Sequence, residues 1–97
     1  MALKIIWTFR AKEDIKHISI YWNKRIGNSS YSNKIRRLTN RYLILLQQYP
    51  KLGRQTDNKF IREIIIREFK IFYIIDESSI YILRFWDTRQ DPDKLVL

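Results

Sequence analysis

The 97-residue sequence contains no cysteine, two glycines, two prolines and a single histidine. Without cysteine the chain has no disulfide and no thiolate nucleophile. One histidine without a cysteine makes no zinc site, and two glycines are too few for a glycine-rich phosphate loop. We therefore expect no metal and no other cofactor, so that any catalysis would depend on arginine, lysine, tyrosine and carboxylate side chains.

Long hydrophobic runs are also missing. No apolar stretch approaches the ~20 residues that a membrane-spanning helix needs, and the N-terminal residues lack the apolar segment of a signal peptide. The absence of cysteine is compatible with a reducing compartment. We expect a cytoplasmic protein without a membrane partner, and the short length without repeats or linkers predicts one domain over residues 1–97.

The charge of the chain is one-sided, because 19 lysines and arginines face 10 aspartates and glutamates, a formal net charge of +9. Such an excess in a small domain indicates an anionic partner: a nucleic acid, an acidic protein or a membrane surface. Three of these cations, Lys34, Arg37 and Arg41, are spaced three and four apart and form a stripe on one helix face. We interpret this stripe as a solvated helix face rather than as a binding site.

The hydrophobic pattern begins with a strand and a helix. Residues 2–8 alternate as a short strand whose buried face carries Leu3, Ile5 and Trp7. A helix over residues 10–26 has an apolar stripe made of Ala11, Ile15, Ile18, Trp22 and Ile26. Thr8 is the predicted N-cap and Gly27 the left-handed stop, with Glu13 and Asp14 expected in the first turn.

A second helix is predicted over residues 30–48 and forms an antiparallel hairpin with the first. Its apolar residues are spaced four and three apart and comprise Tyr31, Ile35, Leu38, Tyr42, Leu45 and Tyr49. Pro50 ends this helix, and the polar residues 50–59 connect it to the next elements.

Residues 60–87 are rich in isoleucine, phenylalanine and tyrosine, which suit a pleated surface, and they predict three antiparallel strands in a meander. Residues 76–79 are the expected turn between the last two strands. Alternation along the final strand places Ile80, Ile82, Arg84 and Trp86 on one face and Tyr81, Leu83, Phe85 and Asp87 on the other. The predicted fold class is α+β: an N-terminal strand, an antiparallel helical hairpin and a three-stranded antiparallel meander.

Each strand of the predicted meander carries a cation among apolar residues. These cations are Arg62, Lys70 and Arg84, and Arg89 follows the last strand. Arginine binds two phosphate oxygens at once, so these side chains are candidates for a phosphate site. Ordinary cross-strand pairing with Glu63, Glu68 or Asp87 is an equal alternative. His17 lies outside the apolar stripe of the first helix, and we interpret it as polar surface rather than as a general base.

The order of the predicted elements and four local motifs resemble the RelE/ParE superfamily of bacterial type II toxins. Residues 50–54, PKLGR, are similar to the P-x-x-G-R turn of that family. Residues 62–64 and 69–73, REI and FKIFY, are similar to its R-E-L and Y-x-I-F-Y strands, and residues 82–92, ILRFWDTRQDP, resemble its closing strand and R-x-D-P end. The resemblance covers nearly the whole chain.

The resemblance implies a small toxin neutralised by a cognate antitoxin, which is acidic and partly disordered until it wraps around the toxin. The ParE branch poisons DNA gyrase, whereas the RelE branch cleaves messenger RNA on the ribosome. The motif at residues 62–64 is closer to the ParE pattern. In addition, Glu63 stands where many RNA-cleaving members carry lysine, and Asp87 stands where many members have histidine.

We therefore predict growth inhibition through DNA gyrase. Two alternatives are a RelE-like, ribosome-dependent and metal-independent endoribonuclease, and a non-toxic basic binding module. In a nuclease, the cations of the meander would bind the scissile phosphate, and a tyrosine or an aspartate of the sheet would transfer the proton. The candidate site residues are Arg62, Lys70, Tyr73, Arg84, Asp87 and Arg89.

Overall fold

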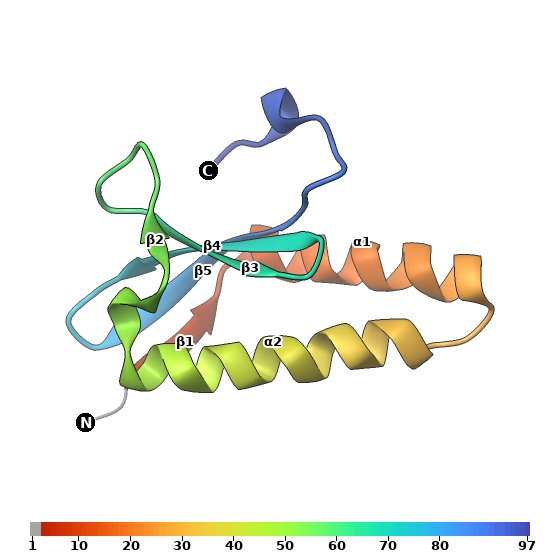
Figure 1. Cartoon of the computed structure of the whole chain (residues 1–97), viewed down its shortest axis with the longest axis horizontal. Helices are drawn as coiled ribbons and strands as arrows, with labels where there is room; N and C mark the ends of the chain where they lie inside the picture. The colour runs from red at the N-terminus through yellow and green to blue at the C-terminus, as the bar shows by residue number, and fades with distance from the viewer. Residues whose placement is uncertain (1–2) are drawn as a thin grey trace.

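The computed structural model describes residues 3–97 and places two long helices along one face of a β-sheet (Figure 1). In chain order the elements are β1 (Lys4–Trp7), α1 (Phe9–Ile26), α2 (Ser30–Gln48), the 3-10 helix η1 (Pro50–Leu52), β2 (Arg54–Gln55), β3 (Arg62–Ile66), β4 (Phe69–Ile75), β5 (Ser79–Asp87) and the 3-10 helix η2 (Pro92–Lys94). This order confirms the predicted α+β fold, and α2 has the predicted bounds. The predicted first strand starts at Ala2, which lies outside the described residues.

The sheet has five strands in the order β1-β5-β4-β3-β2. β3, β4 and β5 form the predicted antiparallel meander, whereas β1 pairs in parallel with residues 79–82 of β5. β2 pairs with β3 through two residue pairs, in a segment that the sequence pattern predicts only as a connection. The first and last strands of the chain are therefore neighbours in the sheet.

Both predicted caps of α1 are confirmed. The Thr8 hydroxyl accepts a hydrogen bond from the Ala11 N–H at 3.3 Å and donates one to the Ile82 carbonyl at 2.8 Å. Gly27 has a φ of +87°, and its N–H donates to the Asn23 carbonyl at 2.9 Å. The left-handed conformation at this position explains the choice of glycine. Thr8 thus joins the start of α1 to β5, and Gly27 turns the chain towards α2.

Two expectations for α1 are wrong. Glu13 and Asp14 lie in its second turn, because the helix begins at Phe9 and its first turn carries no acidic residue. Ile26 belongs to the predicted apolar stripe but is 43% exposed, because the last turns of α1 extend beyond the sheet (Figure 1). The buried part of the stripe is therefore shorter than the helix.

The buried face of α2 is shifted from the predicted one: Ile35 is buried and Tyr31, Leu38 and Tyr42 pack partly buried against the core, as predicted. Its buried residues are Ser32, Ile35, Thr39, Leu43 and Leu46. Leu45 and Tyr49, which belong to the predicted stripe, are 42% and 61% exposed. The Thr39 hydroxyl donates to the Ile35 carbonyl at 2.8 Å, and the Ser32 hydroxyl donates to an asparagine side chain of α1 at 2.7 Å. Two hydroxyl side chains therefore lie in the buried stripe, where a pattern based on hydrophobicity alone does not place them.

The sheet carries apolar clusters on both faces. The main core includes the helix-facing residues Ile64, Ile66, Phe69, Ile71, Tyr73, Ile80, Ile82 and Phe85. A smaller cluster on the opposite face consists of Ile61, Phe72 and Trp86, with Ile74, Leu83 and Leu95 packed against it. The C-terminal tail thus covers part of the face that the helices leave free.

A β-bulge in β5 breaks the predicted alternation. Phe72 pairs with Arg84 and Tyr73 pairs with Ile82, so that Leu83 is an extra residue in the ladder. The bulge overturns the predicted face made of Ile80, Ile82, Arg84 and Trp86. The two isoleucines belong to the helix-facing core, whereas the tryptophan packs in the opposite cluster.

The tail is also held by hydrogen bonds. The Val96 carbonyl accepts from the Arg84 guanidinium at 2.8 Å and from the Arg10 guanidinium at 3.5 Å.

No helix within residues 3–97 is both long enough and apolar enough to cross a membrane.

Gly53, after η1, lies against the centre of the sheet. Its N–H donates to the Tyr73 hydroxyl at 2.9 Å, and that hydroxyl donates to the Pro50 carbonyl at 2.8 Å. The φ of Gly53 is −70°, which any residue adopts, so that space rather than backbone freedom decides the residue type. A Cβ at this position would lie 2.6 Å from the Tyr73 hydroxyl and 2.7 Å from the Glu63 carbonyl oxygen.

We expect Gly53→Ala to lower the free energy of unfolding by about 1–3 kcal/mol, because the methyl group overpacks a site with no free space. Urea denaturation of the wild type and the variant measures the change. Gln55→Ala, a truncation at an exposed position two residues away, is the control and should change stability by less than about 0.5 kcal/mol. Equal stability of Gly53→Ala and the wild type would contradict the close packing described here.

Candidate functional site

A cleft of about 700 Å³ lies between α1 and the end of β5. α1 contributes Asp14, His17 and Tyr21, which are spaced three and four residues apart and so share one helix face. β5 and the segment after it contribute Arg84, Trp86, Asp87 and Arg89. Three of the six predicted site residues are therefore brought together in this cleft.

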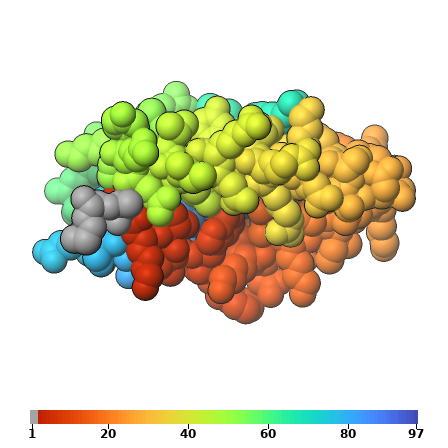
Figure 2. Space-filling view, turned by 90° about the horizontal axis from the view of Figure 1, so that it is seen from below, coloured from red at the N-terminus to blue at the C-terminus, as the bar shows by residue number. Residues whose placement is uncertain are grey.

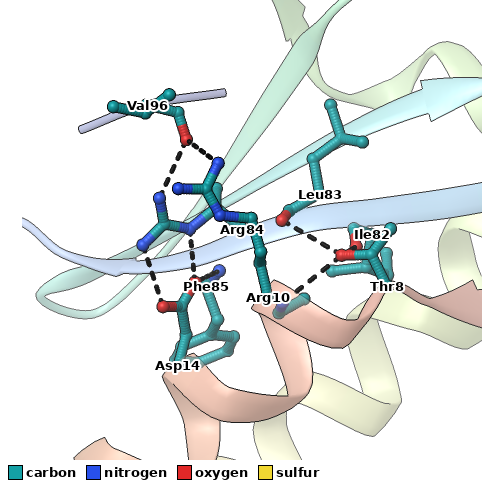
Figure 3. A network of polar contacts seen from close by, with 9 residues as sticks. Thr8, Arg10, Asp14, Ile82, Leu83, Arg84, Phe85 and Val96 are labelled. Carbon is teal, nitrogen blue, oxygen red and sulfur yellow. Dashed lines mark hydrogen bonds and ion pairs between the residues drawn. The ribbon is translucent and has the colours of Figure 1, made fainter.

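The ion pair between Asp14 and Arg84 forms one wall of the cleft (Figure 3). The Arg84 Nε donates to Asp14 Oδ2 at 2.7 Å, and its terminal nitrogen donates to Oδ1 at 2.9 Å. The two side chains are 12% and 16% exposed, so water screens the pair only weakly. The hydrogen bond with Asp14 raises the pKa of Arg84 and outweighs the opposing effect of burial.

Asp14 also completes the hydrogen bonding of the sheet. β1 pairs with β5 only as far as Ile82, so β5 has no strand neighbour on this edge beyond that residue. The N–H of Phe85 donates instead to Asp14 Oδ2 at 3.0 Å. The carboxylate of α1 thus takes the place of a strand carbonyl, and it aligns α1 with the end of β5.

A second ion pair, between Asp87 and Arg89, borders the cleft. Asp87 accepts from the Arg89 Nε at 3.0 Å, from its terminal nitrogen at 2.6 Å and from its backbone N–H at 2.9 Å. Burial raises the pKa of Asp87, but the bonds from Arg89 outweigh it and hold this pKa below its ordinary value. The Arg89 guanidinium also lies 4.8 Å from the ring centre of Trp22, which positions the side chain by a cation–π contact.

The other three predicted site residues lie away from the cleft. The Lys70 Nζ is 3.6 Å from Glu63 Oε2, and Glu63 also binds Arg54 at 2.8 Å. Arg62 donates to the Gly53 carbonyl at 2.7 Å. Tyr73 is fully buried, and burial raises its pKa against the opposing effects of the Gly53 N–H and the Arg62 charge. The structure therefore does not gather the six candidates around one phosphate position.

Seven residues of the cleft are absent from the predicted set: Asp14, His17, Ile18, Tyr21, Phe85, Trp86 and Gln90. The helical spacing of Asp14, His17 and Tyr21 is visible in the sequence. Nothing in the sequence shows, however, that this face of the helix meets the end of the last strand. The Arg84 guanidinium lies 5.5 Å from the ring centre of Trp86. Tyr21 is 48% exposed. His17 has a 74% exposed side chain, 3.9 Å from Glu13.

The cleft is suited to contact rather than to strong anion binding. Its two arginines are each paired with an aspartate, so the four charges cancel formally. An incoming anion would compete with a carboxylate that is already bound in a bidentate manner. Within residues 3–97, no three histidine, aspartate or glutamate side chains are arranged to hold a metal ion.

Comparison with known proteins gives a family match and matches among solved structures. Residues 5–92 match the family model described as "ParE toxin of type II toxin-antitoxin system, parDE". Among solved structures the chain is similar to one from the "Chromosomal ParDE TA system from P. aeruginosa", with a TM-score of 0.74 and 22% identity over 87% of this chain and 94% of that chain. The structural likeness at this identity concerns the fold. A search of curated proteins found no match.

We expect Asp14→Asn to lower the free energy of unfolding by about 2–3 kcal/mol, somewhat less than the ~3–5 kcal/mol for breaking a fully buried pair. The variant leaves the Arg84 guanidinium without its carboxylate in a poorly solvated position. Chemical denaturation at neutral pH measures the loss. Glu13→Gln removes the same charge from the neighbouring residue, which has only an exposed histidine near it, and should cost less than about 0.5 kcal/mol. Similar costs for the two variants would show that the pair has no special role.

Asp87 should contribute to the acid lability of the fold. Its pKa in the folded state lies below the ordinary 3.8, so its contribution is present above that pH and is lost as the pH falls through the folded value. We expect Asp87→Asn to be less stable than the wild type at neutral pH and to lose less stability below pH 3.8. Urea denaturation at a series of pH values gives both slopes.

Asp57→Asn is the control for this titration, because Asp57 is exposed in a loop. Its profile should follow that of the wild type. If Asp87→Asn also runs parallel to the wild type at acid pH, the ion pair with Arg89 does not stabilise the fold.

Proposed function

Because the chain belongs to the ParE toxin family and is the toxin component of a type II toxin–antitoxin system, we propose that it arrests growth by inhibiting DNA gyrase through direct contact. The predicted resemblance to the RelE/ParE superfamily, closer to its ParE side, is confirmed by the family match. An antitoxin is its natural partner. The target and the mode of inhibition are the new parts of the proposal.

The placement of the predicted nuclease residues supports inhibition by contact. Cleavage by a ribose 2′-hydroxyl needs a group within hydrogen-bonding reach that takes the proton, and cations that stabilise the developing phosphorane charge. The Tyr73 hydroxyl is buried and already makes two hydrogen bonds. Lys70, Arg84 and Arg89 each have a carboxylate partner. Each cation would first have to leave that partner, which disfavours a phosphate-cleaving pocket built from them.

The cleft between α1 and β5 is the surface that we assign to gyrase. Tryptophan, tyrosine and arginine carry much of the binding energy at protein interfaces, and the cleft contains Tyr21, Trp86, Arg84 and Arg89. Tyr21 is half-exposed and rests edge-on against Trp22, with ring centres 5.3 Å apart. A rigid aromatic side chain supported in this way loses little entropy when a partner covers it.

The proposed antitoxin is acidic and partly disordered when free, and it folds on the toxin surface as it binds. The net charge of +9 supports an acidic partner because complementary charge speeds encounter and selects against basic competitors. Tyr21 is a candidate anchor for the antitoxin as well, since an antitoxin that covers this residue also blocks the target. A gyrase inhibitor acts where bacterial DNA lies, so we place the protein in the cytoplasm.

One observation favours a RelE-like endoribonuclease as the second candidate. His17 lies in the same cleft as Arg84 and Arg89, so that a histidine able to accept a proton stands near two guanidinium groups. In that case the cleft would receive a phosphate after one of the ion pairs opens. Both candidates use the same cleft: the first binds gyrase there without cutting, whereas the second would cleave messenger RNA.

Purified gyrase should lose its supercoiling activity when the wild-type protein is added, as measured by the topoisomer distribution of a relaxed plasmid. We expect Tyr21→Ala to raise the concentration for half-inhibition about tenfold or more, the effect of an interface anchor worth at least ~1.4 kcal/mol. Ile20→Ala is the matched control, because Ile20 is also 48% exposed on α1 but lies outside the cleft. This variant should inhibit within about threefold of the wild type.

Unchanged supercoiling at saturating protein rejects gyrase as the target. Primer extension on a translated message then tests the second candidate, which predicts new cuts at ribosomal A-site codons that disappear in His17→Asn. Equal weakening by Tyr21→Ala and Ile20→Ala would move the gyrase contact away from the cleft. Normal growth of a host that expresses the chain without antitoxin would favour a non-toxic binding module instead.

A further inference from the structure

Most of the net positive charge of the molecule is concentrated on the helical hairpin. Residues 9–48 contain nine lysines and arginines but only two carboxylates, Glu13 and Asp14, which accounts for a formal +7 of the chain's +9. α2 carries four cations and no acidic residue. In the sheet, by contrast, Arg54, Lys70 and Arg84 are each paired with a carboxylate. The hairpin is therefore the part of the molecule with uncompensated charge.

This charge borders a groove between the two helices. The groove has a volume of about 420 Å³ and is lined by Lys12 and Lys16 from α1 and by Arg36 and Asn40 from α2. Figure 2 shows the two helices side by side across this face of the molecule. The residues at i and i+4 of a helix are about 5–6 Å apart, so the two lysines form a row along the groove. We call this groove, which is also lined by Trp7, Ile15 and Thr39, the hairpin groove.

The cations of the hairpin groove have no carboxylate partner among the described residues and can therefore bind an external anion. Arg36 reaches across to α1, where its guanidinium donates to the Ser19 hydroxyl at 3.1 Å and keeps its other N–H groups free for a ligand. Among the described residues, no carboxylate lies within 4.0 Å of any cation of the groove, since the ion pairs found involve other residues. Both carboxylates of the hairpin are directed elsewhere: Asp14 binds Arg84, and Glu13 lies near His17.

We propose that the hairpin groove binds the phosphodiester backbone of duplex DNA. Half or more of the hydrogen bonds in protein–DNA complexes go to phosphate and sugar, from lysine, arginine, asparagine and hydroxyl side chains. The groove offers this set of donors. The cationic surface continues around α2, where Lys34, Arg37 and Arg41 line a second shallow depression. The contacts are to backbone phosphates, so the binding is independent of base sequence.

The composition of the groove favours a nucleic acid over an acidic peptide. A segment that folds on a protein surface depends on buried apolar anchors, with charged residues depleted from the centre of the interface. Three cations line the hairpin groove together with Trp7 and Ile15, two apolar residues that are partly buried against the core. Protein–DNA interfaces are strongly positive, which matches the three cations of the groove that have no carboxylate partner among the described residues.

The choice of DNA over RNA depends on the proposed function, because a topoisomerase works on a DNA duplex. The hairpin groove and the cleft lie on different sides of α1: Lys12 and Lys16 face α2, whereas Asp14 and Tyr21 face β5. One helix would therefore contact the enzyme on one side and the DNA held by that enzyme on the other. Such a toxin would bridge enzyme and DNA, and its affinity for their complex would exceed its affinity for either alone.

Fluorescence anisotropy with a labelled DNA duplex of about 20 base pairs, two helical turns, tests the proposal without gyrase. The titration is repeated between about 50 and 200 mM salt for the wild type and for the triple variant Lys12→Gln, Lys16→Gln, Arg36→Gln. We expect the variant to bind at least about tenfold more weakly at the lowest salt, and its slope of log K against log salt to be smaller by about 3, which is about one unit per lost phosphate contact.

A charge-matched triple variant, Lys4→Gln, Lys59→Gln, Lys94→Gln, removes three exposed cations from outside the hairpin. Its salt slope should stay within about one unit of the wild type, because net charge alone contributes no direct phosphate contact. Equal loss in the two triple variants would overturn the assignment, as would undetectable DNA binding by the wild type. Circular dichroism spectra establish that both variants are folded.

Two further measurements distinguish DNA from other ligands of the groove, and DNA binding from the inhibition of gyrase. Equal or tighter binding of an RNA duplex of the same sequence would overturn the assignment to DNA, and so would a groove variant that loses affinity for the cognate antitoxin while its DNA titration is unchanged. Supercoiling inhibition is measured separately. Loss of DNA binding in a toxin that still inhibits gyrase refutes a role for the groove in inhibition, whereas DNA binding by a toxin without effect on gyrase refutes only the proposed target.

Discussion

The ion pair between Asp14 and Arg84 determines how the helical hairpin sits on the sheet. It joins residues 70 positions apart in the chain, and the same carboxylate satisfies the N–H of Phe85 where β1 no longer covers the edge of β5. Together with the hydroxyl of Thr8, it aligns α1 along the last strand. One side of α1 then forms the cleft with β5, and the opposite side is left to form the groove with α2.

Local signals were sufficient for most elements of the fold. Thr8 and Gly27 mark the ends of α1 through side-chain and backbone chemistry that acts within four residues, and the polar run at residues 76–79 forms the predicted hairpin turn. The features that escaped prediction depend on distant contacts. β1 finds its parallel partner across the whole chain, and α2 turns a face with Ser32 and Thr39 inward because their hydroxyls are satisfied by the neighbouring backbone and α1.

The candidate site was harder to predict than the fold for the same reason. The bulge at Leu83 changes which side chains of β5 share a face, and no propensity of the sequence IYILRFWD marks it. The sequence pattern identified Arg84, Asp87 and Arg89 as candidates and Asp87 as a possible partner, but it did not identify Asp14, which comes from another element. Pairing within the domain explains why cations in the meander are compatible with a stable sheet, because a charge on a largely buried face costs desolvation unless it is compensated.

The parallel pairing of β1 with β5 has a consequence for synthesis. Residues 4–7 hydrogen-bond with residues 79–82 in the sheet, and the start of α1 is tied to the same strand. A nascent chain thus lacks the central part of its core until nearly all of its length has left the ribosome. Copies that terminate before β5 lack the strand that joins β1 to β4, so they cannot assemble the sheet and are expected to be readily degraded.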